Sequence, residues 1–326
     1  MSVRTTLTGP FPRSEELVGA TRDLDRGRTT PDALEEIYAR TEAEIVQLEE
    51  RLGTDRITAG YLRWADLFRP ISESWGGFAV GPVTRWFETN TFYRQPILRA
   101  PPERTPGAIA QRLPPPIRGP AARRALVVLP GPYTLAGLLE NRSGETSEAL
   151  VHRLGRLLGD ELRELRGLGY EAFEFADPLL VTHPPSGPTS ESLLAAYRAI
   201  QAGASGATTI VWTYFGDAAP QLALLGRLPV SAIGVDLSET DPAALERGIA
   251  GHSIGLGVID PRTTLSEDPG QIAQIARRIQ ERAHPPELWL GPGAPLDLLP
   301  AEPAAKKLHV LAAARSALAA AEGRRS

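Results

Sequence analysis

Eight short runs of apolar and β-branched residues recur along the chain, and most are apolar at nearly every position. Continuous apolar runs of this length are typical of parallel strands buried on both faces of a sheet. The runs therefore predict eight strands, at Thr5–Thr8, Arg56–Tyr61, Ala125–Leu129, Ala172–Phe175, Thr208–Trp212, Ala232–Asp236, Ile254–Ile259 and Glu287–Leu290.

Amphipathic segments with helical spacing lie between these runs. Pro31–Leu52 predicts a long helix, because Thr30 is a favourable N-cap and Pro31 fits the first turn. Thr146–Leu168 repeats leucine at helical spacing and is followed by Gly169, a residue that favours a helix C-terminus. The further predicted helices are Ser190–Ala204, Asp217–Leu225, Pro242–Ala250, Asp268–Arg282 and Pro303–Ala321.

Strands that alternate with helices indicate the α/β class with a parallel sheet. A doubly wound sheet gives the same alternation, but eight strands favour a single (β/α)8 TIM barrel. Gly76–Leu98 breaks the rhythm, because it is rich in aromatic residues and turn signals. We interpret it as a hairpin inserted after strand two, followed by a solvated crossover at Ala100–Arg124. We expect residues 1–326 to form one barrel domain with an insertion at about 76–124.

Composition excludes several classes of function. The net charge is −4, without the basic excess typical of proteins that bind nucleic acid or anionic membranes. The chain has no cysteine, which excludes disulfides, a cysteine nucleophile and thiolate metal ligands. The first residues lack the apolar core of a secretory signal, and no apolar run reaches the roughly 18 residues of a membrane span. We expect a cytoplasmic protein.

Candidate site residues follow the predicted strands, because barrel active sites form at the C-terminal ends of strands. Tyr214, Asp177 and Asp236 stand at or just after strand ends and are the candidates for acid–base catalysis. Arginine forms paired hydrogen bonds with carboxylates, so an anionic or zwitterionic ligand is expected. The candidate substrate-binding residues are Arg13, Arg69, Arg94, Tyr133, Trp212 and Arg262. Structural salt bridges across the barrel mouth are the alternative role for such residues.

No metal site is expected from the residues alone. The histidines are His152, His183, His252, His284 and His309, and they do not cluster along the sequence. None has the spacing of a zinc motif, and no phosphate-binding or nucleophile motif occurs in a suitable context. The glycines of Gly251–Gly257 fall on a predicted strand, and we interpret them as barrel packing.

Seven segments, in order along the chain, carry a resemblance to a known family. They are Thr6–Arg13, Arg63–Pro70, Asn90–Arg94, Gly131–Ala136, Glu174–Pro178, Gly257–Thr264 and Leu290–Leu296. Together they resemble the catalytic, C-terminal-type barrel of cobalamin-independent methionine synthases, in the short single-domain form. The resemblance implies a (β/α)8 barrel and methyl transfer from a folate-type or other donor to a thiol such as homocysteine.

The chain departs from that family at the zinc ligands, which the resemblance places on strands five, six and eight. Trp212 and Tyr214 stand where the family has a histidine and a cysteine, Asp236 stands at the glutamate position, and Ala294 stands at the second cysteine. A lone carboxylate cannot form a tetrahedral zinc site, so zinc is not expected. Trp212 and Tyr214 are expected to fill the vacated space.

We therefore expect a methyl- or alkyltransferase homologue that acts on a small amino-acid-like or thiol substrate without zinc activation. No cofactor is expected, and a folate-type methyl donor would be a substrate. A lyase or isomerase on the same barrel, or a non-catalytic ligand-binding or partner protein, are the alternatives. A partner protein or a homo-oligomer is compatible with either reading.

Overall fold

A curled sheet of parallel strands forms the centre of the computed structural model, which describes residues 3–322. The strands are β1 (Val3–Thr5), β4 (Val127–Pro130), β6 (Ala172–Ala176), β7 (Thr208–Thr213), β8 (Ala232–Asp236), β9 (Ser253–Ile259) and β10 (Leu288–Pro292). They are ordered β1-β10-β9-β8-β7-β6-β4, and every neighbouring pair is parallel. Nearly all their side chains are buried, as the continuous apolar runs predicted.

Residues 55–57, at the start of the predicted second strand, close the ring of strands between β1 and β4. The backbone N–H of Asp55 donates to the Thr5 carbonyl at 3.1 Å, and Ile57 pairs with Ala125 in a parallel bridge. The α/β barrel prediction is confirmed, but a strand over Arg56–Tyr61 is wrong. The carboxylate of Glu49 accepts hydrogen bonds from the backbone of Thr58 and Ala59, and the chain turns there into a 3-10 helix, η1 (Ala59–Tyr61).

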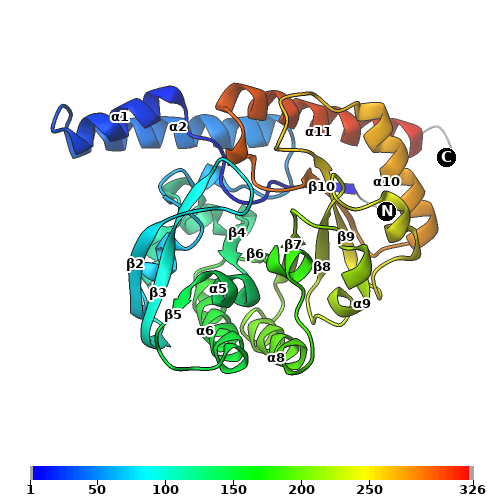
Figure 1. Ribbon diagram of the computed structural model, residues 1–326. Helices are drawn as coiled ribbons and strands as arrows, with labels where there is room; N and C mark the ends of the chain where they lie inside the picture. Colours follow the sequence, from blue (N-terminus) through cyan, green and yellow to red (C-terminus); the bar gives the residue numbers. More distant parts are fainter. Residues whose placement is uncertain (1–2, 323–326) are drawn as a thin grey trace.

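The helices cover the outside of the sheet (Figure 1). They are α1 (Glu15–Asp25), α2 (Pro31–Arg51), α3 (Arg69–Ser72), α4 (Ala108–Arg112), α5 (Pro132–Leu138), α6 (Ser147–Gly167), α7 (Leu179–Thr182), α8 (Pro188–Gly203), α9 (Leu222–Leu225), α10 (Pro269–Ala283) and α11 (Ala301–Glu322). Thr30 and Thr146 cap α2 and α6 with their side chains, and Asp268 caps α10. These caps explain why the predicted starts of the long helices fall within one or two residues of the observed ones.

Two predicted helices are shorter than expected. Residues 217–225 form a 3-10 turn, η4 (Ala219–Gln221), and the single turn of α9. Residues 242–250 form only the 3-10 helix η5 (Pro242–Arg247), because Gly248 has a positive φ of 74° that ends it. The helix α1 was not predicted from the sequence.

The inserted hairpin is confirmed. The strands β2 (Gly76–Arg85) and β3 (Phe92–Glu103) pair antiparallel and form a second sheet with β5 (Glu140–Asn141), seen at one side of the barrel in Figure 1. The solvated crossover is wrong. That stretch forms α4 and the 3-10 helices η2 (Pro115–Ile117) and η3 (Gly119–Arg124), and it buries Ile109, Leu113 and Ile117 in the core. The last 3-10 helix is η6 (Leu296–Leu298), after β10.

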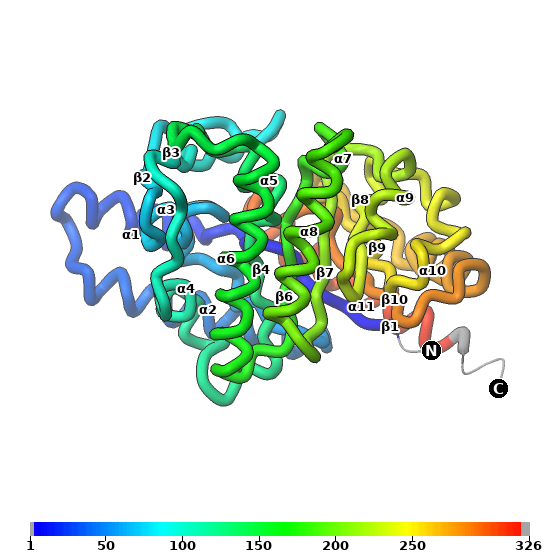
Figure 2. Tube along the Cα trace, turned by 90° about the horizontal axis from the view of Figure 1, so that it is seen from below, coloured from blue at the N-terminus to red at the C-terminus, as the bar shows by residue number. Residues whose placement is uncertain are grey.

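The closest pair of helices is α6 and α8, which lie side by side in Figure 2. Their backbones approach through glycine and alanine. A Cβ atom added at Gly159 would lie 2.4 Å from the carbonyl oxygen of Ala199, and one added at Gly203 would lie 1.8 Å from that of Gly159. The two helices can pack this closely only because these positions carry no side chain.

Gly159→Ala therefore tests the packing of α6 on α8. Its methyl group would have to displace backbone, so we expect a loss of about 1–3 kcal/mol of unfolding free energy. Gly167→Ala, near the end of the same helix, is the matched control, because nothing lies within 4 Å of its added Cβ. Thermal denaturation of both variants measures the difference. Equal melting temperatures would contradict the packing argument.

Candidate functional site

A narrow pocket opens at the C-terminal ends of the strands, where barrel active sites lie. Its volume is about 60 Å³, and its lining includes Trp64, Asp66, Trp86, Tyr93, Tyr214 and Asp297. These residues come from the segment after η1, from the hairpin, from the end of β7 and from η6. Ligand pockets for larger molecules are typically about 300–1,000 Å³, so this pocket fits a small group rather than a whole folate.

Aromatic side chains join the hairpin to the barrel mouth. Phe87 in the hairpin loop contacts Phe215 after β7, with ring centroids 5.3 Å apart. Phe87 also packs edge-to-face on Trp86, and Phe215 packs edge-to-face on Tyr214. Both phenylalanines have positive φ, 48° and 68°, a conformation that is unfavourable for a bulky residue. The contact across the mouth thus stabilises two strained backbone positions.

Tyr214 is the one predicted catalytic residue that lines this pocket. Its side chain is fully buried, and its hydroxyl has no hydrogen-bond partner among residues 3–322. Burial raises the Tyr214 pKa well above its usual value, and the charges of Glu174, Asp297 and Asp177 raise it further. The phenol therefore stays neutral and can donate a hydrogen bond to a ligand.

Two carboxyl groups line the pocket with Tyr214. Burial raises the Asp297 pKa to about 7, although the nearby Arg13 charge lowers it. Asp66 accepts hydrogen bonds from the backbone N–H groups of Phe68, Arg69 and Arg94, at 2.9–3.0 Å. Burial still raises the Asp66 pKa. Asp297 titrates near neutral pH, which is the property that a general acid or base requires.

A further buried carboxyl group, Glu174, lies on β6. It stands two residues before Ala176, which lines the pocket, so both point into the barrel because strand side chains alternate. The Thr8 hydroxyl donates to one oxygen of Glu174, and the other oxygen has no partner among the described residues. Burial raises the Glu174 pKa to about 8, so the group is mostly protonated at neutral pH.

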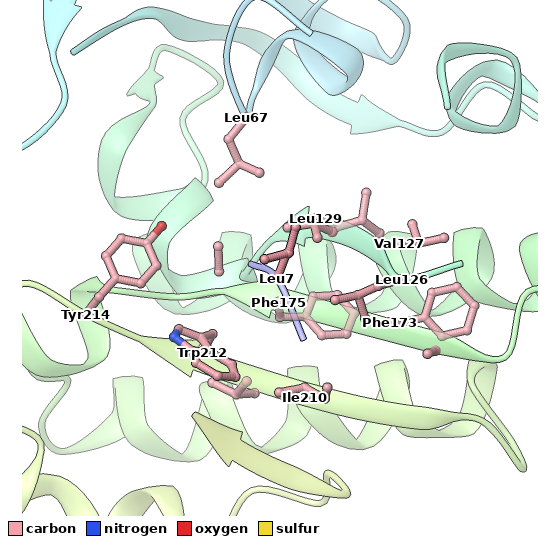
Figure 3. Packing of buried hydrophobic residues seen from close by; sticks show 14 of the residues in the cluster. Leu7, Leu67, Leu126, Val127, Leu129, Phe173, Phe175, Ile210, Trp212 and Tyr214 are labelled. Carbon is pink, nitrogen blue, oxygen red and sulfur yellow. The ribbon is translucent and has the colours of Figure 1, made fainter. Parts of the chain in front are cut away.

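Trp212 fills the barrel interior beneath the pocket (Figure 3). Its indole lies over the successive strands β8, β9 and β10, and each of them has a glycine at the point of contact. Added Cβ atoms at Gly234, Gly255 and Gly291 would lie 2.3, 2.7 and 3.1 Å from the Trp212 ring. The indole nitrogen donates to the Gly293 carbonyl at 3.0 Å. The glycines of Gly251–Gly257 were interpreted as packing residues, and Gly255 on β9 confirms this interpretation.

The other two predicted catalytic residues make internal contacts instead. Asp177 accepts hydrogen bonds from the Thr134 backbone N–H at 2.7 Å and from the Tyr197 hydroxyl at 2.8 Å, near the start of α5. Burial raises its pKa to about 6. Asp236 lies beneath Gly293 and accepts from the Ser238 backbone N–H at 2.9 Å. Neither carboxyl group lines the pocket.

The predicted substrate-binding arginines lie around the pocket rather than in its lining. Arg13 donates to the carbonyls of Leu62 and Trp64, which orders the segment after η1. Arg69 pairs with Glu73 at 2.5 Å, and Arg262 pairs with Asp260 at 3.0 Å and also with Glu239. The Arg94 side chain is exposed and donates to the Gly81 carbonyl.

Tyr133 lies in a separate surface groove, where its hydroxyl donates to the His183 carbonyl. Trp212 is beneath the pocket, as described above. Of the nine site residues predicted from the sequence, the structure brings only Tyr214 into the pocket lining. The roles assigned to all nine remain predictions.

The buried positions of the carboxyl groups of Glu174 and Asp297 in and beneath the barrel mouth were not predicted from the sequence. Glu174 is a charged residue inside the apolar run of β6, and this interruption is a usable signal for a buried functional carboxyl group. Asp297 follows the glycine- and proline-rich end of β10 and gives no local signal. Only the ring closure of the barrel brings it beside Tyr214.

The residues that the sequence resemblance placed at zinc-ligand positions do not supply a tetrahedral set of donor atoms. The Trp212 indole occupies the interior beside β8 and β10, and its nitrogen already donates a hydrogen bond to the Gly293 carbonyl. Ala294 supplies no ligand atom. Within residues 3–322 no group of three or more His, Cys, Asp or Glu side chains could hold a metal ion. No helix in the same range is long and apolar enough to cross a membrane.

The parallel strands, their ring closure and the covering helices define an α/β barrel protein with a pocket at the C-terminal ends of its strands. The sequence model described as "Cobalamin-independent synthase, N-terminal domain" matches residues 78–284, more than half of the chain. The chain therefore belongs to the cobalamin-independent methionine synthase family, as its motifs indicated. The matching model describes the family's N-terminal domain, whereas the sequence motifs resembled its catalytic, C-terminal-type barrel.

Relatives of two lengths match the chain. A "5-methyltetrahydropteroyltriglutamate--homocysteine methyltransferase" of Synechococcus sp. is 27% identical over 88% of this chain, which spans only 41% of that protein. A "Methionine synthase" of Sulfurisphaera tokodaii is 24% identical over 93% of this chain and 89% of its own length. The chain thus spans less than half of the longer relatives and most of the shorter ones.

Solved structures support the same fold. A B12-independent methionine synthase from Shewanella sp. W3-18-1, in complex with selenomethionine, has a TM-score of 0.71, with 15% identity over 91% of this chain and 92% of that chain. A putative vitamin-B12-independent methionine synthase from Listeria monocytogenes has a TM-score of 0.70, with 16% identity over 97% of this chain and 99% of that chain.

The packing of Trp212 can be tested by a double-mutant cycle. Gly234→Ala places a methyl group against the indole, and we expect it to destabilise the protein by about 1–3 kcal/mol. In a Trp212→Leu background the indole is absent, so the same alanine should cost less. Chemical denaturation of the four proteins measures the coupling. Equal costs in both backgrounds would show that Trp212 does not require Gly234.

The buried state of Glu174 predicts a pH dependence of stability. Its pKa is about 8 in the folded protein and near 4.5 when unfolded, so its ionisation destabilises the fold as the pH rises from about 4.5 to about 8. Glu174→Gln removes the ionisation. The melting temperature of the wild type should fall by a few degrees relative to this variant between pH 5 and pH 8.

Glu171→Gln is the matched control, because Glu171 precedes the same strand but is only half-buried and is paired with Arg123. It should follow the wild-type profile. A Glu174→Gln profile parallel to the wild type would mean that Glu174 ionises freely in the folded protein.

Proposed function

We propose that this protein is a methionine-synthase-like methyl- or alkyltransferase that acts on a small amino-acid-like or thiol substrate without zinc activation. The observation that carries the proposal is that Tyr214 and Asp297 line the same pocket at the barrel mouth. Membership of the family supports the reaction class, and the unsuited zinc positions support the loss of the metal. The small pocket supports a substrate of a few heavy atoms at the reacting end.

The pocket residues have properties suited to transfer onto a thiol. A free thiol has a pKa of about 8.5 and reacts as the thiolate, so it needs a base when no zinc is present. Asp297, with its pKa of about 7, accepts the thiol proton as the sulfur attacks the methyl carbon. Tyr214 remains protonated and donates a hydrogen bond to the substrate. The leaving group keeps the electron pair of the broken methyl bond.

Without zinc, a tertiary amine such as a methylated folate is a poor donor to a neutral thiol. We therefore propose that a folate-type donor is at most a slow substrate and that a more reactive methyl donor is used. We also propose that the substrate is a small molecule, that the protein is cytoplasmic, and that it binds neither nucleic acid nor membranes. A partner protein or a homo-oligomer is compatible with this function.

A non-catalytic ligand-binding protein is the second candidate. The observation that favours it is Trp212, which fills the barrel interior where the family's metal would lie. The neutral, unpartnered Tyr214 hydroxyl and the titratable Asp297 favour the enzyme instead, because a plugged barrel would not require them. A lyase or isomerase using the same pair is distinguished by exchange of solvent protons into amino acids or keto acids.

The proposed function is tested by metal analysis and a methyl-transfer assay on the purified protein. We expect zinc well below one ion per chain and methyl transfer to homocysteine or a related thiol from a reactive donor. Asp297→Asn should lower the rate about 100-fold, the usual contribution of a general base. Asp217→Asn, in the exposed loop after β7, is the control and should leave the rate unchanged. Stoichiometric zinc together with zinc-dependent methylation of homocysteine would refute the proposal.

A further inference from the structure

The lining of the pocket is aromatic and acidic. Trp64, Trp86, Phe92, Tyr93 and Tyr214 surround it from the segment after η1, from the hairpin and from the end of β7. The only charged residues in the lining are two carboxyl groups, and no arginine, lysine or histidine lines it within residues 3–322. This composition differs from the arginine-rich anion site that the sequence predicted.

The rings are held in place by the surrounding structure. Trp86 packs edge-to-face on Tyr93, with centroids 5.6 Å apart at 82°. The Trp64 indole nitrogen donates to the Arg112 carbonyl at 2.7 Å, and its ring packs on Tyr61. We call the aromatic residues that line the pocket the aromatic cage. Because the packed side chains cannot rotate freely, the cage exists before a ligand binds, and little side-chain entropy is lost on binding.

Such a cage attracts cations. The face of an aromatic ring carries negative charge, and aromatic residues around a pocket are a known means of binding methylated ammonium groups. The cations outside the lining partly offset the carboxyl groups, since Arg13 acts on Asp297 and Arg69 acts on Asp66. The lining nevertheless contains only negative and neutral groups, so an anion would be repelled there.

We propose that this pocket binds a small methylated onium group, a sulfonium or a quaternary ammonium, as the methyl donor of the proposed reaction. The lining favours an onium group over a simple ammonium ion. An ammonium needs hydrogen-bond acceptors for each of its N–H groups, but Asp66 already accepts three backbone hydrogen bonds. Methyl groups on a cation are instead bound by aromatic surroundings, and five aromatic side chains line this pocket.

An onium donor is a better methyl donor than a tertiary amine, because its leaving group departs as a neutral molecule, and Asp297 takes the place of zinc in activating the thiol by accepting the thiol proton. The acceptor thiol transfers its proton to Asp297, and its sulfur forms a bond to the methyl carbon. The bond between that carbon and the onium sulfur or nitrogen breaks, and its electron pair stays on the departing atom, which leaves as a neutral thioether or a neutral tertiary amine. The donor loses its positive charge in this step. The product therefore loses its attraction to the aromatic cage and can leave.

The inference rests on the proposed function but can be tested without any turnover. Trimethylsulfonium and choline are titrated into the full-length protein at constant ionic strength, and binding is followed by calorimetry and by tryptophan fluorescence. The uncharged carbon isostere of choline is the matched ligand, since it has the same shape without the charge. We expect both cations to bind about tenfold or more tightly than the isostere.

Two variants locate the site. Trp86→Leu should weaken binding of the cations about tenfold and leave the isostere nearly unaffected. Asp297→Asn should weaken the cations at pH 8, where the wild-type carboxyl is ionised, and have less effect at pH 6. The charged or titratable groups that interact with Asp297 or share its pocket are Arg13, Tyr214 and Asp66. Tyr38→Leu, on α2 and outside the pocket, is the control for loss of an aromatic residue.

Equal binding of choline and its isostere, or no binding of either cation to the wild type, would overturn the inference. Cation binding that survives Trp86→Leu would also overturn it, because the site would then lie elsewhere. Either result leaves the methyl-transfer assay with other donors to decide the proposed function. Conversely, cation binding without any methyl transfer would support the cage and refute the transferase.

Discussion

The packing of one indole against three glycines determines the interior of this barrel. Trp212, Gly234 and Gly255 are register partners on consecutive strands, and Gly291 follows on the next one. Burial of an aromatic side chain of this size contributes roughly 5 kcal/mol as an upper estimate, but only if the space is free of other side chains. The indole fills the interior beneath the mouth pocket, so the polar groups that line the pocket lie nearer the mouth.

The hairpin provides the other half of the site. Its strands pair beside the barrel, and its aromatic loop reaches Phe215 at the end of β7. Trp86 and Tyr93 thereby become walls of a pocket whose floor is Tyr214. An insertion that interrupts the alternation of strands and helices thus supplies most of the aromatic surface, while the barrel itself supplies the hydroxyl and carboxyl groups.

The sequence was informative where local pattern and burial coincide. The seven apolar strands and the capped helices α2, α6 and α10 could be predicted, because each buries a continuous face and has a clear start signal. The strand predicted at 56–61 does not form. The carboxylate of Glu49, in the last turn of α2, accepts hydrogen bonds from the backbone of Thr58 and Ala59 and so turns the chain out of the sheet. The residues that line the pocket could not be predicted for a related reason. Arginine, tyrosine and aspartate at strand ends can serve ion pairs as well as ligands, and only the folded chain shows that Arg69 and Arg262 are paired with carboxylates.

The closure between β1 and β4 has a consequence for the motions of the molecule. Elsewhere in the sheet the strands are joined by backbone ladders, but here the connection consists of the short contacts of Asp55 and Ile57 and the side chain of Tyr61, whose hydroxyl bonds to the backbone of Leu126 and Val128. Local opening occurs where few hydrogen bonds must break at once. The barrel therefore has a seam, and the segment that follows it carries Trp64 and Asp66. Local opening of this seam would therefore move one wall of the pocket while the rest of the sheet keeps its ladders.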